Sequence, residues 1–200
     1  MKISKTLIED LLIIEPQLFK DDRGFFYESY NKNNLDKVIN VVFVQDNESK
    51  SNKGVVRGLH FQLPPFEQAK LVRCVSGKIF DVAVDLRKNS KTYGKSFSIE
   101  LSSENNKQLF VPKGFAHGYQ VLSETASVNY KVDNFYNPKS DSGIIWNDKD
   151  LSIDWNLNLY PTFKMFCFLF SNKSKTKQSV INSDDSLCFS ISVASSPRLS

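Results

Sequence analysis

The sequence predicts an all-β domain, a sandwich or a barrel, and three observations support this prediction. Between residues 41 and 133, short runs rich in Val, Ile, Phe and Tyr follow one another. Turn signals such as "VSGK", "KNSKTYG", "VPKG" and "LSET" separate these runs. The connections are too short for the crossovers that parallel strands need, so antiparallel pairing is expected.

In chain order, "NKNNLDKVI" (31–39) is the one segment that looks helical, and it is short. The segments "KLVRCVSGKIFDVAVDL" and "FSIELSSENNKQLFVPKGFAHGYQVL" are interpreted as successive antiparallel pairs. A dense apolar run, "FKMFCFLF" (163–170), then precedes a Ser-, Lys- and Asn-rich segment without glycine. We therefore expect one domain over residues 1–160 and a divergent, partly flexible C-terminal tail over 161–200.

Composition narrows the class of protein. The 200 residues are 40% hydrophobic, which is enough for one substantial core. The 26 basic and 22 acidic residues are scattered and give a net charge of only +4, so no nucleic-acid partner is expected. Three cysteines without CxxC spacing indicate a reduced, cytoplasmic protein. The opening "MKISKTLIEDLLIIEP" is no signal peptide, and no apolar run suggests a membrane anchor.

His60 is one of two histidines and lies in the strand-like run "VVRGLHFQ". Strand side chains alternate between faces. A regular strand would therefore put His60 on one face with Gly58 and Gln62, and put Arg57, Leu59 and Phe61 on the other. Taken alone, such a histidine is more often a hydrogen-bonded structural residue than a catalyst.

Lys70 and Tyr130 each lie on an otherwise apolar stripe of their strand. This pattern indicates that both side chains point inward. His117 alternates with Phe115, Tyr119 and Val121 in the same way. Singly, Lys70 could be a solvated strand lysine and Tyr130 a core aromatic residue. Their functional interpretation depends on the whole set.

Seven segments in order carry a resemblance to a known family. They are "DDRGFFYESYN" (21–31), "FVQDNESKS" (43–51), "GVVRGLHFQ" (54–62), "AKLVRCVSGKIFDVAVDLRKNSKTYGK" (69–95), "LFVPKGFAHGYQVLSE" (109–124), "YKVDNFYNPKSDSGIIWND" (130–148) and "IDW" (153–155). Over about the first 160 residues, this set resembles the dTDP-4-dehydrorhamnose 3,5-epimerases.

The resemblance implies a cupin-type antiparallel jelly-roll barrel, a homodimer and a cytoplasmic enzyme. The implied reaction inverts C3 and C5 of dTDP-4-dehydro-6-deoxy-D-glucose and gives dTDP-4-dehydro-L-rhamnose, in dTDP-L-rhamnose biosynthesis. The 4-keto group acidifies the hydrogens on both neighbouring carbons. This chemistry needs a base, an acid and a group that stabilises the enolate oxygen, and it requires no metal or redox cofactor.

By resemblance, His60 is the base, Tyr130 is the acid on the opposite face of the ring, and Lys70 is the cation at the enolate oxygen. Asp81 matches a residue that supports His117. The resemblance assigns substrate binding to a further set of residues: Arg23, Phe26, Glu28, Gln45, Asn47, Arg57, His117, Tyr136 and Asp141. Arginine is well suited to phosphate oxygens. Arg23 and Phe26 are expected to reach into the active site of a partner subunit.

The chain departs from the family after "IDW". Relatives carry an aspartate there that hydrogen-bonds the catalytic histidine. An ungapped register puts Cys167 at its position, and a gapped register puts Ser174 there. The alternative function is therefore a dTDP-sugar-binding cupin with impaired or single-centre epimerase activity. A metal-dependent cupin oxygenase would need more His and carboxylate ligands than His60 and His117 supply, and the His, Lys and Tyr set favours the 3,5-epimerase over a 3,4-ketoisomerase.

Overall fold

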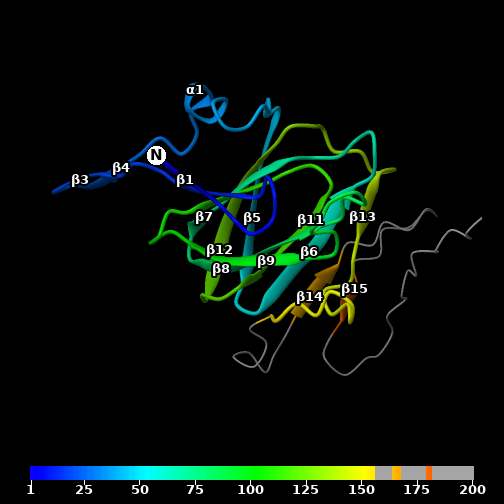
Figure 1. Cartoon of the computed structure of the whole chain (residues 1–200). Coiled ribbons are helices and arrows are strands. Elements are labelled where there is room, and N and C mark those ends of the chain that lie inside the picture. Colours follow the sequence, from blue (N-terminus) through cyan, green and yellow to red (C-terminus); the bar gives the residue numbers. More distant parts are fainter. Residues whose placement is uncertain (156–163, 168–178, 182–200) are drawn as a thin grey trace, which may run out of the picture.

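A computed structural model of the chain describes residues 1–155, 164–167 and 179–181 (Figure 1). Within these residues the chain is almost entirely β-structure, as the sequence predicts, with one short helix, α1 (Lys32–Leu35), inside the expected segment 31–39. No helix in this described part is long and apolar enough to cross a membrane.

The first large sheet contains six strands. Its order is β1 (Lys2–Lys5), β2 (Leu12–Glu15), β10 (Gln108–Val111), β7 (Lys70–Ser76), β12 (Thr125–Val132) and β5 (Gln45–Asn52). All of its neighbouring strands pair antiparallel. This sheet supplies one wall of a two-sheet barrel.

The second large sheet forms the opposite wall. Its order is β15 (Ser179–Ile181), β14 (Lys164–Cys167), β6 (Val55–Gln62), β11 (Phe115–Val121), β8 (Lys78–Asp85) and β9 (Ser96–Ser102), and β13 (Asp141–Gly143) also pairs with β6. Pairing is antiparallel except between β14 and β6, which run parallel. The antiparallel prediction is thus confirmed for nearly the whole described fold.

The predicted pairing of successive strands is mostly wrong. β7 and β8 lie in different sheets, and so do β9 and β10, although the turns between them fall where the sequence places them. Of these strands, β8 and β9 do pair with each other. A short turn sets where a strand ends, but the need to cover a shared apolar core sends the chain from one sheet across to the other.

Three apolar clusters hold the fold together. The central one lies between the sheets and draws side chains from both of them, including Val72, Leu109 and Val128 from the first and Ile79 and Val121 from the second. A second cluster joins α1 to the outer face of the first sheet. A third lies where the segment 144–155, with Trp155, covers the outer face of the second sheet.

One hairpin stands apart from this packing. β3 (Phe19–Asp21) and β4 (Gly24–Phe26) pair only with each other, and all six of their residues are exposed. Figure 1 shows the hairpin projecting from the body of the barrel. Phe19, Phe25 and Phe26 are 54–67% exposed. A projecting arm with apolar side chains is a surface for which the described chain supplies no cover.

Candidate active site

A cavity of about 510 Å³ opens between the two sheets. This volume lies within the range of small-molecule sites. Its walls combine residues from the two sheets and the loops at their ends: Gln45, Asn47, Ser49, Arg57, His60, Phe61, Gln62, Gln68, Lys70, His117, Gly118, Tyr119, Tyr130, Tyr136 and Asp141. All of these residues fall within residues 1–160.

The three predicted catalytic residues meet in this cavity. His60 comes from β6, Lys70 from the start of β7 and Tyr130 from β12, so both sheets contribute. Lys70 and Tyr130 point inward, as their apolar stripes predict. None of the three side chains hydrogen-bonds to another residue in the described part of the chain. Their polar atoms are therefore available to a bound molecule.

The predicted facing of Arg57 is wrong, because β6 does not alternate regularly. Arg57 pairs with Tyr119 and His60 pairs with His117, so two residues of β6, Gly58 and Leu59, lie opposite one residue of β11, which is a β-bulge. Gly58 sits in the bulge at φ +116°, and a Cβ there would lie 2.5 Å from the Cα of Gly118. The bulge turns Arg57 and His60 into the same cavity.

Burial sets the protonation of the central pair. It lowers the pKa of His60 from 6.5 to about 4, and the positive charge of Lys70 adds to this effect. Burial also lowers the pKa of Lys70 from 10.5 to about 8, although Asp81 and Asp141 counteract it. Near neutral pH, His60 is thus a neutral imidazole that can accept a proton, while Lys70 keeps its charge. Burial raises the pKa of Tyr130, which keeps its phenol protonated.

His117 lies opposite His60 in the ladder of β11 and β6. Its Nε2 lies 2.9 and 3.1 Å from the two carboxylate oxygens of Asp81, a residue with no exposed surface. A carboxylate can only accept, so Nε2 carries the proton and donates it. This contact joins the two residues that the resemblance links, and it fixes the orientation of the His117 imidazole.

Polar side chains alternate along the inner face of β5. Gln45, Asn47 and Ser49 line the cavity, and Gln45 Nε2 donates to Asn47 Oδ1 over 2.8 Å. Arg57 Nε donates to Ser51 Oγ over 2.8 Å, which holds the guanidinium near this wall. This row of hydrogen-bonding groups and one cation suits a polar, anionic part of a ligand.

Some cavity residues were not among the predicted site residues. Ser49 and Tyr119 share a hydrogen bond of 2.8 Å on the cavity wall. Ser49 alternates with Gln45 and Asn47, and Tyr119 with His117, so strand parity could have found both. Further residues of this kind are Phe61, Gln62, Gln68 and Gly118.

Tyr136 and Asp141, two of the predicted substrate-binding residues, line the cavity, and the 46% exposure of Tyr136 puts it at the mouth. The Tyr136 hydroxyl donates to Asp141 Oδ2 over 3.3 Å. Burial and the neighbouring Asp141 carboxylate raise the pKa of Tyr136 to about 12, and burial raises the pKa of Asp141. β13 places Asp141 opposite Gln62 at the end of β6.

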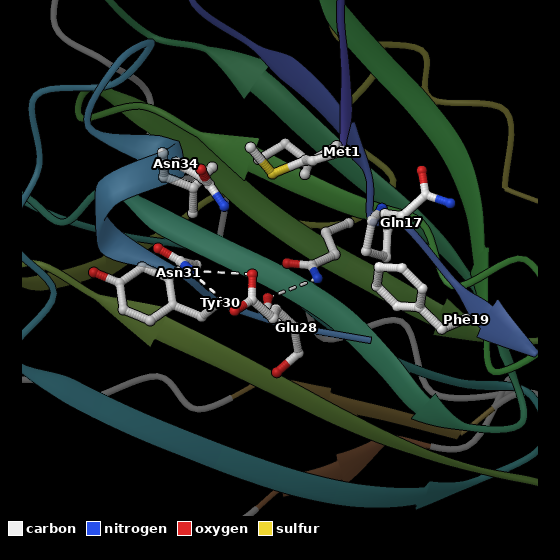
Figure 2. A pocket seen from close by; sticks show the side chains of 12 residues that line it. Met1, Gln17, Phe19, Glu28, Tyr30, Asn31 and Asn34 are labelled. Atoms are coloured by element: carbon white, nitrogen blue, oxygen red, sulfur yellow. Dashed lines mark hydrogen bonds between the residues drawn. The ribbon is translucent and has the colours of Figure 1, made fainter. Parts of the chain in front are cut away.

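Three predicted binding residues lie away from this cavity in the same chain. Arg23 sits at the tip of the β3–β4 hairpin and forms an ion pair with Asp21, and Phe26 is 67% exposed. Glu28 lines a second, smaller pocket of about 120 Å³, where the Asn31 amide donates to its carboxylate (Figure 2). None of the three is among the residues that line the large cavity of the same chain.

The part of the chain with described side chains contains no group of three His, Cys, Asp or Glu residues able to hold a metal ion. Of the two candidate positions for the missing aspartate, Cys167 ends β14, whose Phe166 pairs with Arg57 of β6. Ser174 lies outside the described residues.

Comparisons with known proteins identify the family of this chain. The profile of the dTDP-4-dehydrorhamnose 3,5-epimerase family matches residues 5–182. The dTDP-4-dehydrorhamnose 3,5-epimerase of Shigella flexneri is 54% identical over 157 residues, which cover 78% of this chain and 87% of the relative. The crystal structure of that enzyme from Elizabethkingia anophelis is 55% identical, with a TM-score of 0.75 over 78% of this chain and 86% of the other.

A dTDP-6-deoxy-D-glucose-3,5-epimerase from Legionella pneumophila, solved in complex with dTDP-4-keto-L-rhamnose, is also similar. It is 47% identical, with a TM-score of 0.75, and the match covers 78% of this chain and 83% of that one. The folds therefore agree over the part of the chain that builds the cavity. On these grounds, the chain belongs to the dTDP-4-dehydrorhamnose 3,5-epimerase family.

Proposed function

We propose that this chain converts dTDP-4-dehydro-6-deoxy-D-glucose into dTDP-4-dehydro-L-rhamnose by inverting C3 and C5. The observation that carries the proposal is the convergence of His60, Lys70 and Tyr130 on one cavity of about 510 Å³. Membership of the family supplies the reaction and the substrate class. The enzyme is an isomerase, and we expect it in the cytoplasm, where nucleotide sugars are made.

Each inversion needs one proton removed and one returned. Neutral His60 takes the proton from carbon, the electron pair moves toward the 4-keto oxygen, and Lys70 stabilises the resulting enolate oxygen. Tyr130 gives a proton to the opposite face as the enolate collapses. His60 is then protonated and Tyr130 ionised, and exchange with solvent restores both before the second carbon reacts.

The nucleotide would lie along the polar wall. Arg57 is the cation suited to the diphosphate, and Gln45 and Asn47 offer amide groups on the same side. Tyr136 and Asp141 would contact the sugar or the nucleotide at the mouth. With these roles, the substrate would contact only residues of the predicted domain, 1–160.

Deuterium wash-in tests the reaction. The chain is incubated with substrate in D₂O, and deuterium at C3 and C5 is measured by NMR. Exchange at both carbons, lost in His60→Ala, is expected. Exchange at a single carbon would show a single-centre epimerase, and binding without exchange would show the impaired sugar-binding protein. The impaired alternative is favoured by one observation, that no described carboxylate hydrogen-bonds His60.

We further propose a homodimer in which the β3–β4 arm carries Arg23 and Phe26 into the partner's cavity. The arm's exposed aromatic side chains and its projection from the body of the barrel in Figure 1 support this arrangement. A mixing experiment tests it, with Phe26→Ala chains and His60→Ala chains refolded together. An arm that serves the partner restores one site per mixed dimer, about a quarter of the wild-type rate at equal mixing. An arm that serves its own chain restores none.

A further inference from the structure

The amide of Gln62 bridges the two loops at the mouth of the cavity. Gln62 ends β6 and is 6% exposed. Its Nε2 donates to the Phe66 carbonyl over 2.7 Å and to the Phe135 carbonyl over 3.2 Å. Its Oε1 accepts from the Asn137 backbone N–H over 2.6 Å. Both donors and the carbonyl of this side chain are thus used.

These partners fix which way the amide points. The Asn137 group is a donor and must face Oε1, while the two carbonyls are acceptors and must face Nε2. The flipped amide would set N–H against N–H and oxygen against oxygen. A single orientation therefore satisfies all three contacts, and a buried amide held in this way resists rearrangement.

Two of the contacts lie on the two sides of Tyr136. The Phe135 carbonyl belongs to the peptide unit before Tyr136, and the Asn137 N–H belongs to the unit after it. Gln62 thus holds both peptide units that set the direction of the Tyr136 side chain. That side chain is 46% exposed at the cavity mouth, on a loop where free movement would otherwise be expected.

We propose that Gln62 is a positioning residue, which acts by holding Tyr136 at the mouth of the cavity in the orientation that the sugar nucleotide needs. The proposal rests on the proposed epimerase function. It predicts that loss of the amide matters because Tyr136 moves, and not because Gln62 itself contacts the substrate or supports the fold. A misplacement of a binding group by about 1 Å can cost about a hundredfold in rate.

A double-mutant cycle tests the proposal. Gln62→Met keeps the length of the side chain and removes all three hydrogen bonds, and it should lower kcat/KM at least tenfold. In a Tyr136→Ala background the same change should lower it less than threefold, because the group to be positioned is gone. Equal factors in both backgrounds would overturn the proposal. Gln62→Glu keeps the acceptor for Asn137, and its kcat/KM should fall between those of Gln62→Met and the wild type.

Amide hydrogen exchange gives a readout that does not depend on activity. Gln62→Met should speed exchange in residues 134–141 about tenfold or more. Val82→Ala, in the apolar cluster on the far side of the second sheet, is the control for general destabilisation and should leave these residues protected. Unchanged protection of residues 134–141 in Gln62→Met would refute the proposal that Gln62 holds Tyr136 in place. If the wild type incorporates no deuterium into the substrate, the epimerase proposal fails. The amide-exchange measurement then still tests whether Gln62 holds the loop of Tyr136.

Discussion

The barrel contains two clusters of buried ionisable groups that are built in opposite ways. Asp85, at the end of β8, has no exposed surface, and its carboxylate accepts five hydrogen bonds, from the backbone N–H and guanidinium of Arg87 and the hydroxyls of Ser90 and Thr92. Lys70 is 9% exposed and has no hydrogen-bond partner in the described part of the chain. In the first cluster, the protein supplies the hydrogen-bond partners of the buried charge. The second, formed by His60, Lys70 and Tyr130 and called the open cluster below, leaves its polar groups without hydrogen bonds in the described part of the chain.

The pKa values follow this difference. Burial by itself would raise the pKa of Asp85, but the bonds from Arg87, Ser90 and Thr92 outweigh it and hold the pKa below its usual range. For Lys70, burial is the largest effect and lowers the pKa to about 8. A buried charge with all its partners is costly to break, whereas one without partners destabilises a fold and marks a candidate site where a ligand supplies the partner.

The largest effect on stability is expected at Asp85. Asp85→Ala leaves the Arg87 guanidinium without its main partner and empties a buried position, so the free energy of unfolding should fall by about 3–5 kcal/mol. Because the folded pKa is depressed, the stability that Asp85 supplies is present above its ordinary pKa of 3.8 and is lost as pH falls through the folded value. Urea unfolding at pH 7 and pH 3 measures both effects. A loss that is equal at the two pH values would show that the carboxylate charge is not the cause.

Lys70→Met should lose activity but gain stability, which is the opposite of Asp85→Ala. Activity should fall about 10²–10³-fold, since the group that stabilises the enolate oxygen is lost. At about 1.4 kcal/mol per pH unit, the difference between 10.5 and about 8 makes the buried ammonium cost about 3 kcal/mol, as an upper estimate. The folded pKa is lowered, so this cost is complete below pH 8 and disappears toward pH 10.5.

The Lys70→Met variant should therefore unfold at a higher urea concentration than the wild type at pH 7, and the two should converge by pH 10.5. A variant that is both inactive and less stable would show that Lys70 belongs with Asp85 as a structural residue. Asp85→Ala, measured while still folded, is the matched control, because it should lose stability with little loss of kcat.

The pH profile of kcat/KM should show the open cluster directly. His60 must be neutral and Lys70 charged, so the rate should rise through pH 4, stay level near neutrality and fall tenfold per pH unit above about 8. In Lys70→Met the fall above pH 8 should vanish, and the lower limb should move up from pH 4, because the Lys70 charge no longer lowers the His60 pKa. An upper limb that persists in Lys70→Met would assign it to another group.

The sequence predicts the facing of side chains in the open cluster better than the pairing and regularity of the strands around it. Inward stripes place Lys70 and Tyr130 correctly, because a polar residue between apolar ones in a strand has a defined face. The face of Arg57 relative to His60 could not be predicted from regular alternation, since the extra residue in the bulge at Gly58 puts both side chains on the cavity wall. The crossing of β7 to β8 between sheets was also missed, because a short turn is equally compatible with a hairpin.

The hydrogen bonds of Gln62 show another limit of prediction from sequence. Its partners are backbone groups of residues 66, 135 and 137, and no side-chain pattern reports where backbone groups of distant loops will meet. The same holds for Asp85, whose hydroxyl partners lie in a segment that the sequence marks only as a turn. Which buried groups are satisfied emerges from tertiary structure alone.

The smallest effect is expected from giving His60, in the open cluster, a carboxylate partner. Cys167→Asp would supply a carboxylate at the end of β14, which runs beside β6 and pairs near Arg57. If this is the position from which relatives orient the histidine, the carboxylate should raise the His60 pKa from about 4 toward 6.5 and stabilise the protonated ring after it has taken the proton. We expect kcat to rise about tenfold, which is less than the 10²–10⁴-fold that a positioned acid–base group supplies, and the lower limb of the pH profile to move upward. Cys167→Asn, which offers a similar shape without the charge, is the control and should shift the lower limb far less. Equal rates and pH profiles in both variants and the wild type would place the orienting group elsewhere in the chain, or show that His60 works without one.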